Sequence, residues 1–517
     1  MNRSLTFVSK KLGEIGLLPK ALTCFVFGAL STLAMPPFDA WWLLGLTIPV
    51  LLLLIEGQSH RRSFFLGWLF GFGYFLVVLH WIGVAFLVNA ATDLWMMPFA
   101  VGGLSAAMAV YWGIGAAFTR LLIVRGFPLI FVMPICFGTT EYLRGILFSG
   151  FPWAVPGLAV DGMGGVSQLA YLVGMNGLTF LILLWALTPL LFLQGRQRIA
   201  LVIFLTLPLA WGWGEWRLVQ NPTQYVEGVN LRIVQPNLSQ DDKWRNDHAR
   251  EIFEKLLALS AEPSKTGNPI THVIWPESII PFLIDESPEG LARVAQMLGP
   301  EKILLAGAVR RSSPSSDADY FTSVLVIDGK AKVLGHYDKS HLVPGGEYLP
   351  LAWALEPLGF RRVVNMPDSF RAGLGAESIA VPGAGFAGIQ ICYEAIFPSE
   401  AVDSKHRPDW LVNVTNDGWF GKSTGPYQHL AQLRLRTIEQ GLAAARSANT
   451  GISAVFDPFG RALFQSEIDV EGGFDSPMPK SIAAGLYAKF GDYVLLMMSL
   501  VWFLFGWYFR KSYVLLG

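Results

Sequence analysis

Three side chains in the second half of the chain have types that suit acyl-transfer chemistry. Glu277 and Cys392 follow short apolar runs, and Lys339 lies among residues that read as a loop. Glu277 stands in Trp-Pro-Glu-Ser, Lys339 in Tyr-Asp-Lys-Ser-His-Leu-Val-Pro, and Cys392 ends Gly-Ile-Gln-Ile before Tyr-Glu. A free thiol is mostly protonated at neutral pH, so a nucleophilic cysteine needs a base. Glu277 can take the proton, and the cation of Lys339 favours the thiolate and stabilises an oxyanion. The set therefore predicts a covalent cysteine mechanism.

Each of these residues also has an ordinary interpretation when it is taken alone. A lone cysteine is usually a buried packing residue, a glutamate at a strand end is usually solvated, and a loop lysine is usually a surface charge. The other two cysteines, Cys24 and Cys136, lie in strongly apolar stretches and are expected to pack as small hydrophobic residues. No spacing indicates a zinc site, a disulfide framework or a nucleotide motif, so neither a metal nor a cofactor is expected.

Taken together, the three motifs resemble the nitrilase superfamily, whose members carry a Glu, a Lys and a Cys in this chain order near strand ends. The family patterns W-P-E, Y-x-K-x-H-L-V-P-x-G-E, C-Y-E and N-D-x-W-F-G correspond to Trp275–Glu277, Tyr337–Glu347, Cys392–Glu394 and Asn416–Gly421. With the apolar spans described below, the resemblance narrows to the membrane-anchored bacterial apolipoprotein N-acyltransferases and covers nearly the whole chain. The sequence departs from the pattern at Gly345, where the family usually has Phe. In the family that Phe side chain would form a wall near the acyl chain or the lysine loop, and a glycine has no side chain to form it.

The resemblance implies a reaction and a set of supporting residues. An acyl chain would pass from a membrane phospholipid, through a thioester on Cys392, to the free α-amine of the N-terminal diacylglyceryl-cysteine of an apolipoprotein, the final step of lipoprotein maturation. Two carboxylates would hold the lysine and the catalytic glutamate in place, a tyrosine would line the pocket, and a tryptophan would lie near the site. The two carboxylates are Glu347 and Glu394, the tyrosine is Tyr393, and the tryptophan is Trp244.

The segment that carries these motifs, about 228–475, has the composition of a soluble domain and is long enough to bury its own core. Short β-rich runs alternate there with helical patterns at 248–259 and 428–447, which favours an α/β layered domain over a β-sandwich. The resemblance implies the αββα sandwich of the nitrilases. The expected strands are 229–234, 272–275, 303–309, 323–327, 388–392, 410–414 and 452–456.

The rest of the chain reads as a polytopic helical membrane protein. Hydrophobic residues make up 52% of the sequence and charged residues only 15%. We expect a membrane domain of seven helices over 1–220, the catalytic domain over 228–475, and an eighth helix with a short tail over 485–517. The apolar runs are 17–35, 41–56, 63–88, 94–119, 126–147, 165–193, 198–214 and 490–509.

Orientation follows from the short loops, because cytoplasmic loops collect Lys and Arg. Basic residues precede the first span and follow the second, fourth, sixth and eighth, whereas the intervening loops 36–40, 89–93 and 148–164 contain none. Both termini are therefore predicted to be cytoplasmic, with the catalytic domain on the periplasmic face of the bacterial inner membrane. The 39 basic and 39 acidic side chains balance, so nothing indicates nucleic acid as a partner.

The residues alone leave two other functions open. A membrane-tethered amidase could use the same cysteine, but it would not need eight spans. A transporter or receptor could use the domain only to bind a ligand, but such a protein should show charged residues in the middle of its spans or broken helices in symmetric halves, and neither is evident.

The segment 349–362 is too apolar for an ordinary exposed loop and too short to span a bilayer. One interpretation is a helix packed in the soluble core. The preferred hypothesis is an interfacial arm in which Trp353, Leu355, Leu358 and Phe360 enter the acyl boundary while the arginines at 361 and 362 meet phosphates.

Overall fold

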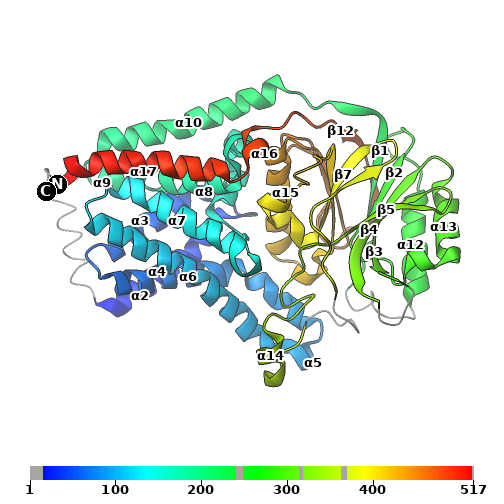
Figure 1. Ribbon diagram of the computed structural model, residues 1–517, viewed down its shortest axis with the longest axis horizontal. Coiled ribbons are helices and arrows are strands. Elements are labelled where there is room, and N and C mark those ends of the chain that lie inside the picture. Colours follow the sequence, from blue (N-terminus) through cyan, green and yellow to red (C-terminus); the bar gives the residue numbers. More distant parts are fainter. Residues whose placement is uncertain (1–15, 240–247, 314–317, 363–369, 515–517) are drawn as a thin grey trace. The chain divides into compact units, whose positions relative to one another are not determined.

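The computed structural model describes residues 16–239, 248–313, 318–362 and 370–514, and the chain forms two compact units (Figure 1). The first comprises residues 1–83, 97–222 and 484–517, and the second comprises residues 84–96 and 223–483. The sequence placed the whole of 1–220 in the membrane domain. The structure instead assigns the short segment 84–96 to the second unit, because its side chains pack there.

The first unit is built from apolar helices whose outer faces carry large hydrophobic side chains. Leu209, Leu201 and Phe505 are all about half exposed or more, which is the surface expected of helices that face lipid rather than water. The helices are α2 (Leu17–Ser31), α3 (Leu44–Ile55), α4 (His60–Val78), α6 (Met97–Val124), α7 (Leu129–Ile146), η6 (Pro156–Leu169), α8 (Ala170–Ala186), α9 (Thr188–Leu193), α10 (Gln197–Gln220), α16 (Leu486–Phe490) and α17 (Tyr493–Val514).

The described residues contain six helical segments long and apolar enough to cross a membrane, or seven if α4 and the following η3 (His80–Leu87), bent by 45°, form one span. The second expected span is the shorter apolar helix Trp41–Ile55. A fully helical segment of that length reaches less far than the roughly 20 residues that a bilayer needs. The structure therefore confirms several apolar helices, while the count of eight spans stays a prediction.

A buried ion pair lies among these helices. Arg144 and Glu141, one turn apart on α7, are joined at 2.5 Å, and Trp112 donates to the Glu141 carboxylate at 2.7 Å. Arg144 also donates to the carbonyl oxygen of Trp153 at 3.0 Å. Because both charges are paired and hydrogen-bonded, their burial is tolerated.

The second unit has four layers, with two six-stranded sheets facing each other between helices (Figure 1). One sheet has the order β12-β1-β2-β3-β4-β5 and the other β11-β10-β9-β8-β7-β6. The strands are β1 (Tyr225–Gln235), β2 (His272–Trp275), β3 (Ile303–Arg311), β4 (Tyr320–Asp328), β5 (Val333–Asp338), β6 (Ser378–Val381), β7 (Gly385–Ile391), β8 (Trp410–Thr415), β9 (Ala444–Ala448), β10 (Ala454–Phe456), β11 (Ala462–Gln465) and β12 (Gly472–Pro479).

Helices cover the outer face of each sheet. α12 (Ala249–Ala261) and α13 (Pro288–Leu298) pack on the first sheet, and α15 (Gly425–Gln440) packs on the second. Apolar side chains from both sheets, such as Ile233 and Val412, meet in the middle of the sandwich. This arrangement is the αββα sandwich that the sequence motifs predicted.

The three predicted catalytic residues each follow a strand of this sandwich. Glu277 comes after β2, Lys339 after β5, and Cys392 after β7. In the middle of each sheet, β1, β2 and β3 run parallel, as do β7, β8 and β9. β5 runs in the same direction as β3, because the β3–β4 and β4–β5 pairs are both antiparallel, so Glu277 and Lys339 leave the same edge of the first sheet, while Cys392 leaves the second sheet after β7.

One helix expectation was wrong at its end. The sequence predicted a helix over 428–447, but α15 ends at Gln440, and the chain then turns at Gly441, whose φ is 64°. The following run Ala444–Ala448 is β9, a fully buried central strand. Its alanines have high helix propensity, but pairing with β8 and β10 overrides it.

The apolar segment after the lysine motif is not a core helix. It forms the short turns α14 (Ala352–Leu355) and η9 (Glu356–Leu358), neither of which buries a residue, and Trp353 is 80% exposed. Arg361 donates to Asp93 at 3.0 Å, and Phe360 packs on Trp95 with ring centroids 5.0 Å apart. Arg361 is therefore held by a protein carboxylate, and insertion of the exposed apolar residues into lipid stays a prediction.

Candidate active site

The Cys392 thiol sits on a sharp turn between β7 and the short helix η10 (Cys392–Ile396). The φ of Cys392 is 51°, in the left-handed region that a residue with a side chain rarely adopts. The side chain is 8% exposed. Such a conformation costs of order 1–3 kcal/mol and persists only where neighbours hold it, as happens at functional sites.

Glu277, Lys339 and Glu347 form one buried network. The Lys339 ammonium lies 3.1 Å from Oε1 of Glu277 and 2.9 Å from Oε1 of Glu347. The second oxygen of Glu277 accepts the backbone N–H of Asn416 at 3.0 Å, and that of Glu347 accepts the N–H of Val343 at 2.8 Å. Both carboxylates are thus fixed at two points, and the lysine is fixed between them.

A glycine allows Glu277 to approach the sheet. A Cβ atom on Gly307 of β3 would lie 2.0 Å from the carbonyl oxygen of Pro276 and 2.8 Å from the Cα atom of Glu277. Any larger residue at position 307 would therefore push the glutamate out of place.

The charges of this network act on the thiol. Burial alone would lower the pKa of Lys339, but the charges of Glu277 and Glu347 outweigh it and hold that pKa well above its usual value. Burial and the charge of Glu277 raise the pKa of the Cys392 thiol, and Lys339 offsets only part of this rise. The resting site therefore holds an ammonium and a protonated thiol, so the cysteine needs Glu277 as its base even though the Lys339 cation favours the thiolate.

Glu394 fastens the lysine loop to the cysteine strand. Its Oε1 accepts from the Tyr337 hydroxyl and the Ser340 N–H, each at 2.7 Å, and its Oε2 accepts from the Ile391 N–H at 2.7 Å. The resemblance implied that Glu347 and Glu394 hold Lys339 and Glu277. Glu347 bonds directly to Lys339, whereas the described hydrogen bonds of Glu394 reach the Tyr337 and Ser340 hydroxyls and the backbone on either side of the site.

The remaining predicted residues have different outcomes. Tyr393 is buried, and its ring stands edge-on to His341 at 5.5 Å and to Phe397 at 5.0 Å. Gly345 adopts a φ of 77°, and a Cβ atom there would meet open space, so this position supplies no wall. Trp244 lies outside the described residues.

A buried cluster behind the cysteine was missed in the sequence. Nε2 of His429, on α15, lies 2.9 Å from the carbonyl oxygen of Cys392, and its Nδ1 lies 2.9 Å from Oδ1 of Asp417. Arg446 of β9 reaches the other oxygen of Asp417 at 2.5 Å. Because a carbonyl can only accept, Nε2 of His429 must carry a proton and donate it.

The charges of the cluster are mutually compensated. Burial would raise the pKa of Asp417, but the charge of Arg446 and the hydrogen bonds with His429 and Thr415 lower it to about 2. Asp417 therefore stays ionised and orients His429, which holds the strained Cys392 turn through its carbonyl. The N-D-x-W-F-G motif contains Asp417, but nothing in the sequence linked it to a histidine and an arginine on other elements.

We expect His429→Ala to slow acylation of Cys392 by about 10²-fold without weakening substrate binding, because a small displacement of a reacting atom costs this much. His429→Gln should recover part of the rate, since its amide can still donate to the carbonyl. Single-turnover rates at a saturating concentration of the acyl donor measure the effect. The exposed His406 provides a matched control as His406→Ala, and an equal loss there, or a change confined to KM, would contradict this role.

Comparison with known proteins identifies the family to which this chain belongs. Residues 27–188 match the family described as apolipoprotein N-acyltransferase N-terminal domain, and residues 230–472 match carbon-nitrogen hydrolase. The chain is 39% identical over 506 residues to an apolipoprotein N-acyltransferase of Rhodopseudomonas palustris, covering 93% of this chain and 94% of the relative. It is 40% identical over 499 residues to that of Bradyrhizobium diazoefficiens, covering 92% of each.

Among solved structures, the chain is similar to an amidase from Nesterenkonia sp. AN1, with 15% identity, a TM-score of 0.37, and coverage of 53% of this chain and 98% of the amidase. The full-length relatives cover both units, from the apolar helices to the sandwich that carries Cys392. The chain therefore belongs to the apolipoprotein N-acyltransferase family, a membrane-anchored branch of the nitrilase superfamily.

Proposed function

We propose that this protein transfers an acyl chain from a membrane phospholipid to the free α-amine of a lipoprotein's N-terminal diacylglyceryl-cysteine, with Cys392 as the nucleophile. The observation that carries the proposal is the buried network of Glu277, Lys339 and Glu347, whose charges act on the Cys392 thiol. The donor and the acceptor follow from the family to which the chain belongs.

In the first half-reaction, the sulfur of Cys392 attacks the ester carbonyl carbon of the phospholipid while Glu277 takes the thiol proton. Lys339 has three N–H donors, two of which point at carboxylates, and the third can stabilise the oxyanion of the tetrahedral intermediate. The carbon–oxygen bond to glycerol then breaks. Glu277 returns its proton to the departing oxygen. The lysophospholipid then dissociates, and the acyl chain remains on the sulfur of Cys392 as a thioester.

In the second half-reaction, the neutral α-amine of the acceptor attacks the thioester carbonyl. Glu277 removes one proton from the nitrogen, the carbon–sulfur bond breaks, and the proton returns to the sulfur of Cys392. The amide product leaves and the resting thiol is restored. The raised pKa of the Cys392 thiol suits this cycle, because the proton is held on sulfur until a substrate draws it to Glu277.

The same proposal includes the orientation of the enzyme in the inner membrane. The alternation of loops that contain Lys or Arg with loops that contain neither supports cytoplasmic termini and a periplasmic catalytic unit. Both substrates stay anchored in the bilayer, so a catalytic unit that is tethered to membrane helices meets them without releasing either one into water.

The decisive experiment follows the acyl group on the full-length chain in detergent. Incubation with phosphatidylethanolamine should add one acyl mass to the peptide that contains Cys392. Adding a diacylglyceryl-cysteine peptide should then remove this mass and yield the N-acylated peptide. The same peptide with an acetylated α-amine is the matched control and should leave the adduct in place.

Two results would contradict the proposal. If no adduct forms on Cys392, the nucleophile is wrong. If the adduct decays to free fatty acid at the same rate with either peptide, water is the acceptor and the protein is a hydrolase of the amidase kind.

A further inference from the structure

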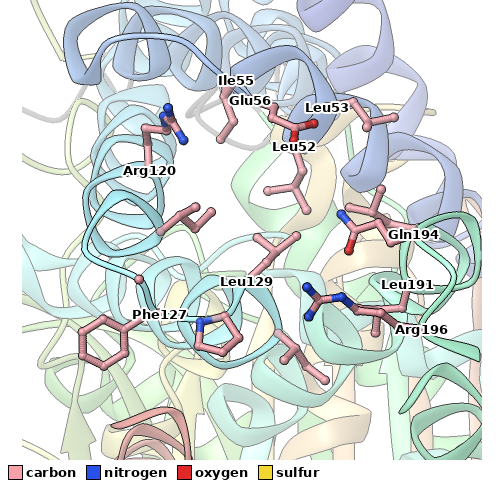
Figure 2. A pocket seen from close by; sticks show the side chains of 15 residues that line it. Leu52, Leu53, Ile55, Glu56, Arg120, Phe127, Leu129, Leu191, Gln194 and Arg196 are labelled. Atoms are coloured by element: carbon pink, nitrogen blue, oxygen red, sulfur yellow. The ribbon is translucent and has the colours of Figure 1, made fainter. Parts of the chain in front are cut away.

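A cavity of about 280 Å³ lies in the first unit, at the end of the helical bundle where α3 and α9 stop and α6 is followed by α7 (Figure 2). Every lining residue belongs to the first unit, so the cavity is separate from the Cys392 site in the second. The lining residues are Leu52, Leu53, Ile55, Glu56, Arg120, Ile123, Gly126, Phe127, Pro128, Leu129, Ile130, Leu190, Leu191, Gln194 and Arg196.

The lining is divided chemically into two parts. Leucines, isoleucines and Phe127 form an apolar wall, while Arg120, Arg196 and Gln194 supply hydrogen-bond donors. Figure 2 shows the two arginines entering from different sides, with leucine side chains between them. An apolar wall next to convergent donors is the usual composition of a site for an amphipathic ligand.

The charge of the cavity is positive. Arg120 is oriented by a hydrogen bond from Nε to the carbonyl oxygen of Gln58 at 3.0 Å. A third arginine, Arg510, lies over the Phe127 ring at 4.9 Å from its centroid. Arg510 is not part of the lining, so the lining itself carries two cations, Arg120 and Arg196, against one acid, Glu56, which is exposed. Partial burial lowers the pKa of Arg196, so a neighbouring anion would offset the unfavourable desolvation of its charge.

This end of the bundle is also the end where the basic loops gather, near the level at which lipid phosphates lie. A small inorganic anion would use only the arginines, whereas a neutral lipid would use only the apolar wall. A molecule that carries a phosphodiester next to hydrocarbon satisfies both. Arginine suits this role because its planar donors match phosphate oxygens.

We propose that this cavity binds an anionic phospholipid, with its phosphodiester between Arg120 and Arg196 and its glycerol and upper acyl chains against the leucine wall. The lipid is bound as a ligand of the bundle and not as the acyl donor, because no lining residue belongs to the catalytic unit. Binding ties together four helix ends and therefore stabilises the folded membrane unit by mass action.

The test uses the full-length chain in a neutral detergent, with added phosphatidylglycerol as the probe. We expect phosphatidylglycerol to raise the Tm of the wild type and native mass spectrometry to detect one retained lipid. Phosphatidylcholine at the same concentration should produce a smaller Tm shift, because its choline cation offsets the charge of its phosphodiester, and inorganic phosphate should produce neither effect. Arg120→Gln/Arg196→Gln should weaken the binding by about twenty-five-fold, because each arginine contributes roughly fivefold.

The matched control is Arg125→Gln/Arg198→Gln, which removes the same charge at the same end from residues outside the lining. This control should keep both the Tm shift and the lipid. If the double variant does not fold, Arg196→Gln alone, in the loop after α9, should still weaken binding by about fivefold.

The acyl-transfer rate at saturating donor should stay within about twofold of wild type in both double variants, because the cavity is not the donor site. Equal loss of lipid in the control variant would show that the lipid is held only by general attraction to the basic end of the bundle, which would overturn the proposed site. A Tm shift from inorganic phosphate alone would indicate a small-anion site, and an unchanged shift in the Arg120/Arg196 variant would overturn the proposal.

Discussion

Cys392→Ser is expected to lower acyl-adduct formation to background, and Cys392→Ala should do the same. The pKa of the thiol is already raised by burial and by Glu277, and a hydroxyl is far harder to deprotonate than a thiol. Glu277 is therefore too weak a base to activate serine at the same position. Mass spectrometry of the Cys392 peptide after incubation with phospholipid measures the result.

Loss of folding must be separated from loss of chemistry. The thiol is small, so either substitution should change the free energy of unfolding by only about 1 kcal/mol. A thermal transition close to that of the wild type would show that the loss lies in the chemistry. Cys136→Ser, in α7 of the first unit, is the matched cysteine control and should keep the adduct. An adduct at normal rate in either Cys392 variant would remove the nucleophile assignment.

Lys339→Met is expected to slow thioester formation by about 10²- to 10³-fold, since it removes the donor that stabilises the first oxyanion. It also leaves Glu277 and Glu347 buried without the cation that lies between them. Such a loss typically costs about 3–5 kcal/mol. Both a lower Tm and a slower single-turnover rate should therefore appear.

A double variant separates these two effects. Lys339→Met/Glu347→Gln removes one of the two buried carboxylates and should restore much of the thermal stability, while the rate of adduct formation stays low. Glu277→Gln should be similarly slow, because its amide keeps an acceptor for the Asn416 N–H but takes no proton. If either Lys339→Met or Glu277→Gln formed the adduct at the normal rate and stalled only when the amine was added, the role assigned to that residue would be wrong.

The protonated resting thiol has a consequence for inhibitor design. A small alkylating reagent that does not engage Glu277 meets a thiol rather than a thiolate, because burial and the nearby carboxylate favour the neutral form. Reactivity should therefore depend on how well a compound imitates the ester and draws the proton to Glu277.

The local sequence determined the catalytic unit to a large degree. Strand 272–275 was predicted with its exact bounds, and each of the other predicted strands overlaps an observed one. These runs are β-branched or apolar, and turn residues bound them, so local propensity and pattern agree with the fold. Glu277 and Cys392 were visible for the same reason, since a polar residue after a buried strand is a local signal, whereas Lys339 was recognised only from its motif, because the strand β5 before it was not predicted.

The sequence was a poorer guide where non-local contacts decide the outcome. β9 reads as helix because its alanines have no β preference, and only pairing between two buried strands makes it a strand. The segment 84–96 reads as part of the membrane domain, yet Asp93 and Trp95 bind Arg361 and Phe360, which are more than 260 residues away in the sequence.

The sequence by itself determined that this is a membrane-anchored cysteine enzyme of the N-acyltransferase family, because short motifs and long apolar runs carry that information locally. Only the tertiary structure decided which groups surround the thiol. It brought His429 to the Cys392 carbonyl, linked Glu394 to the backbone on both sides of the site, and placed Arg120 and Arg196 around one cavity. Apart from the local bond between Glu394 and Ile391, these contacts join elements that are distant in the chain, so no local pattern of residues could reveal them.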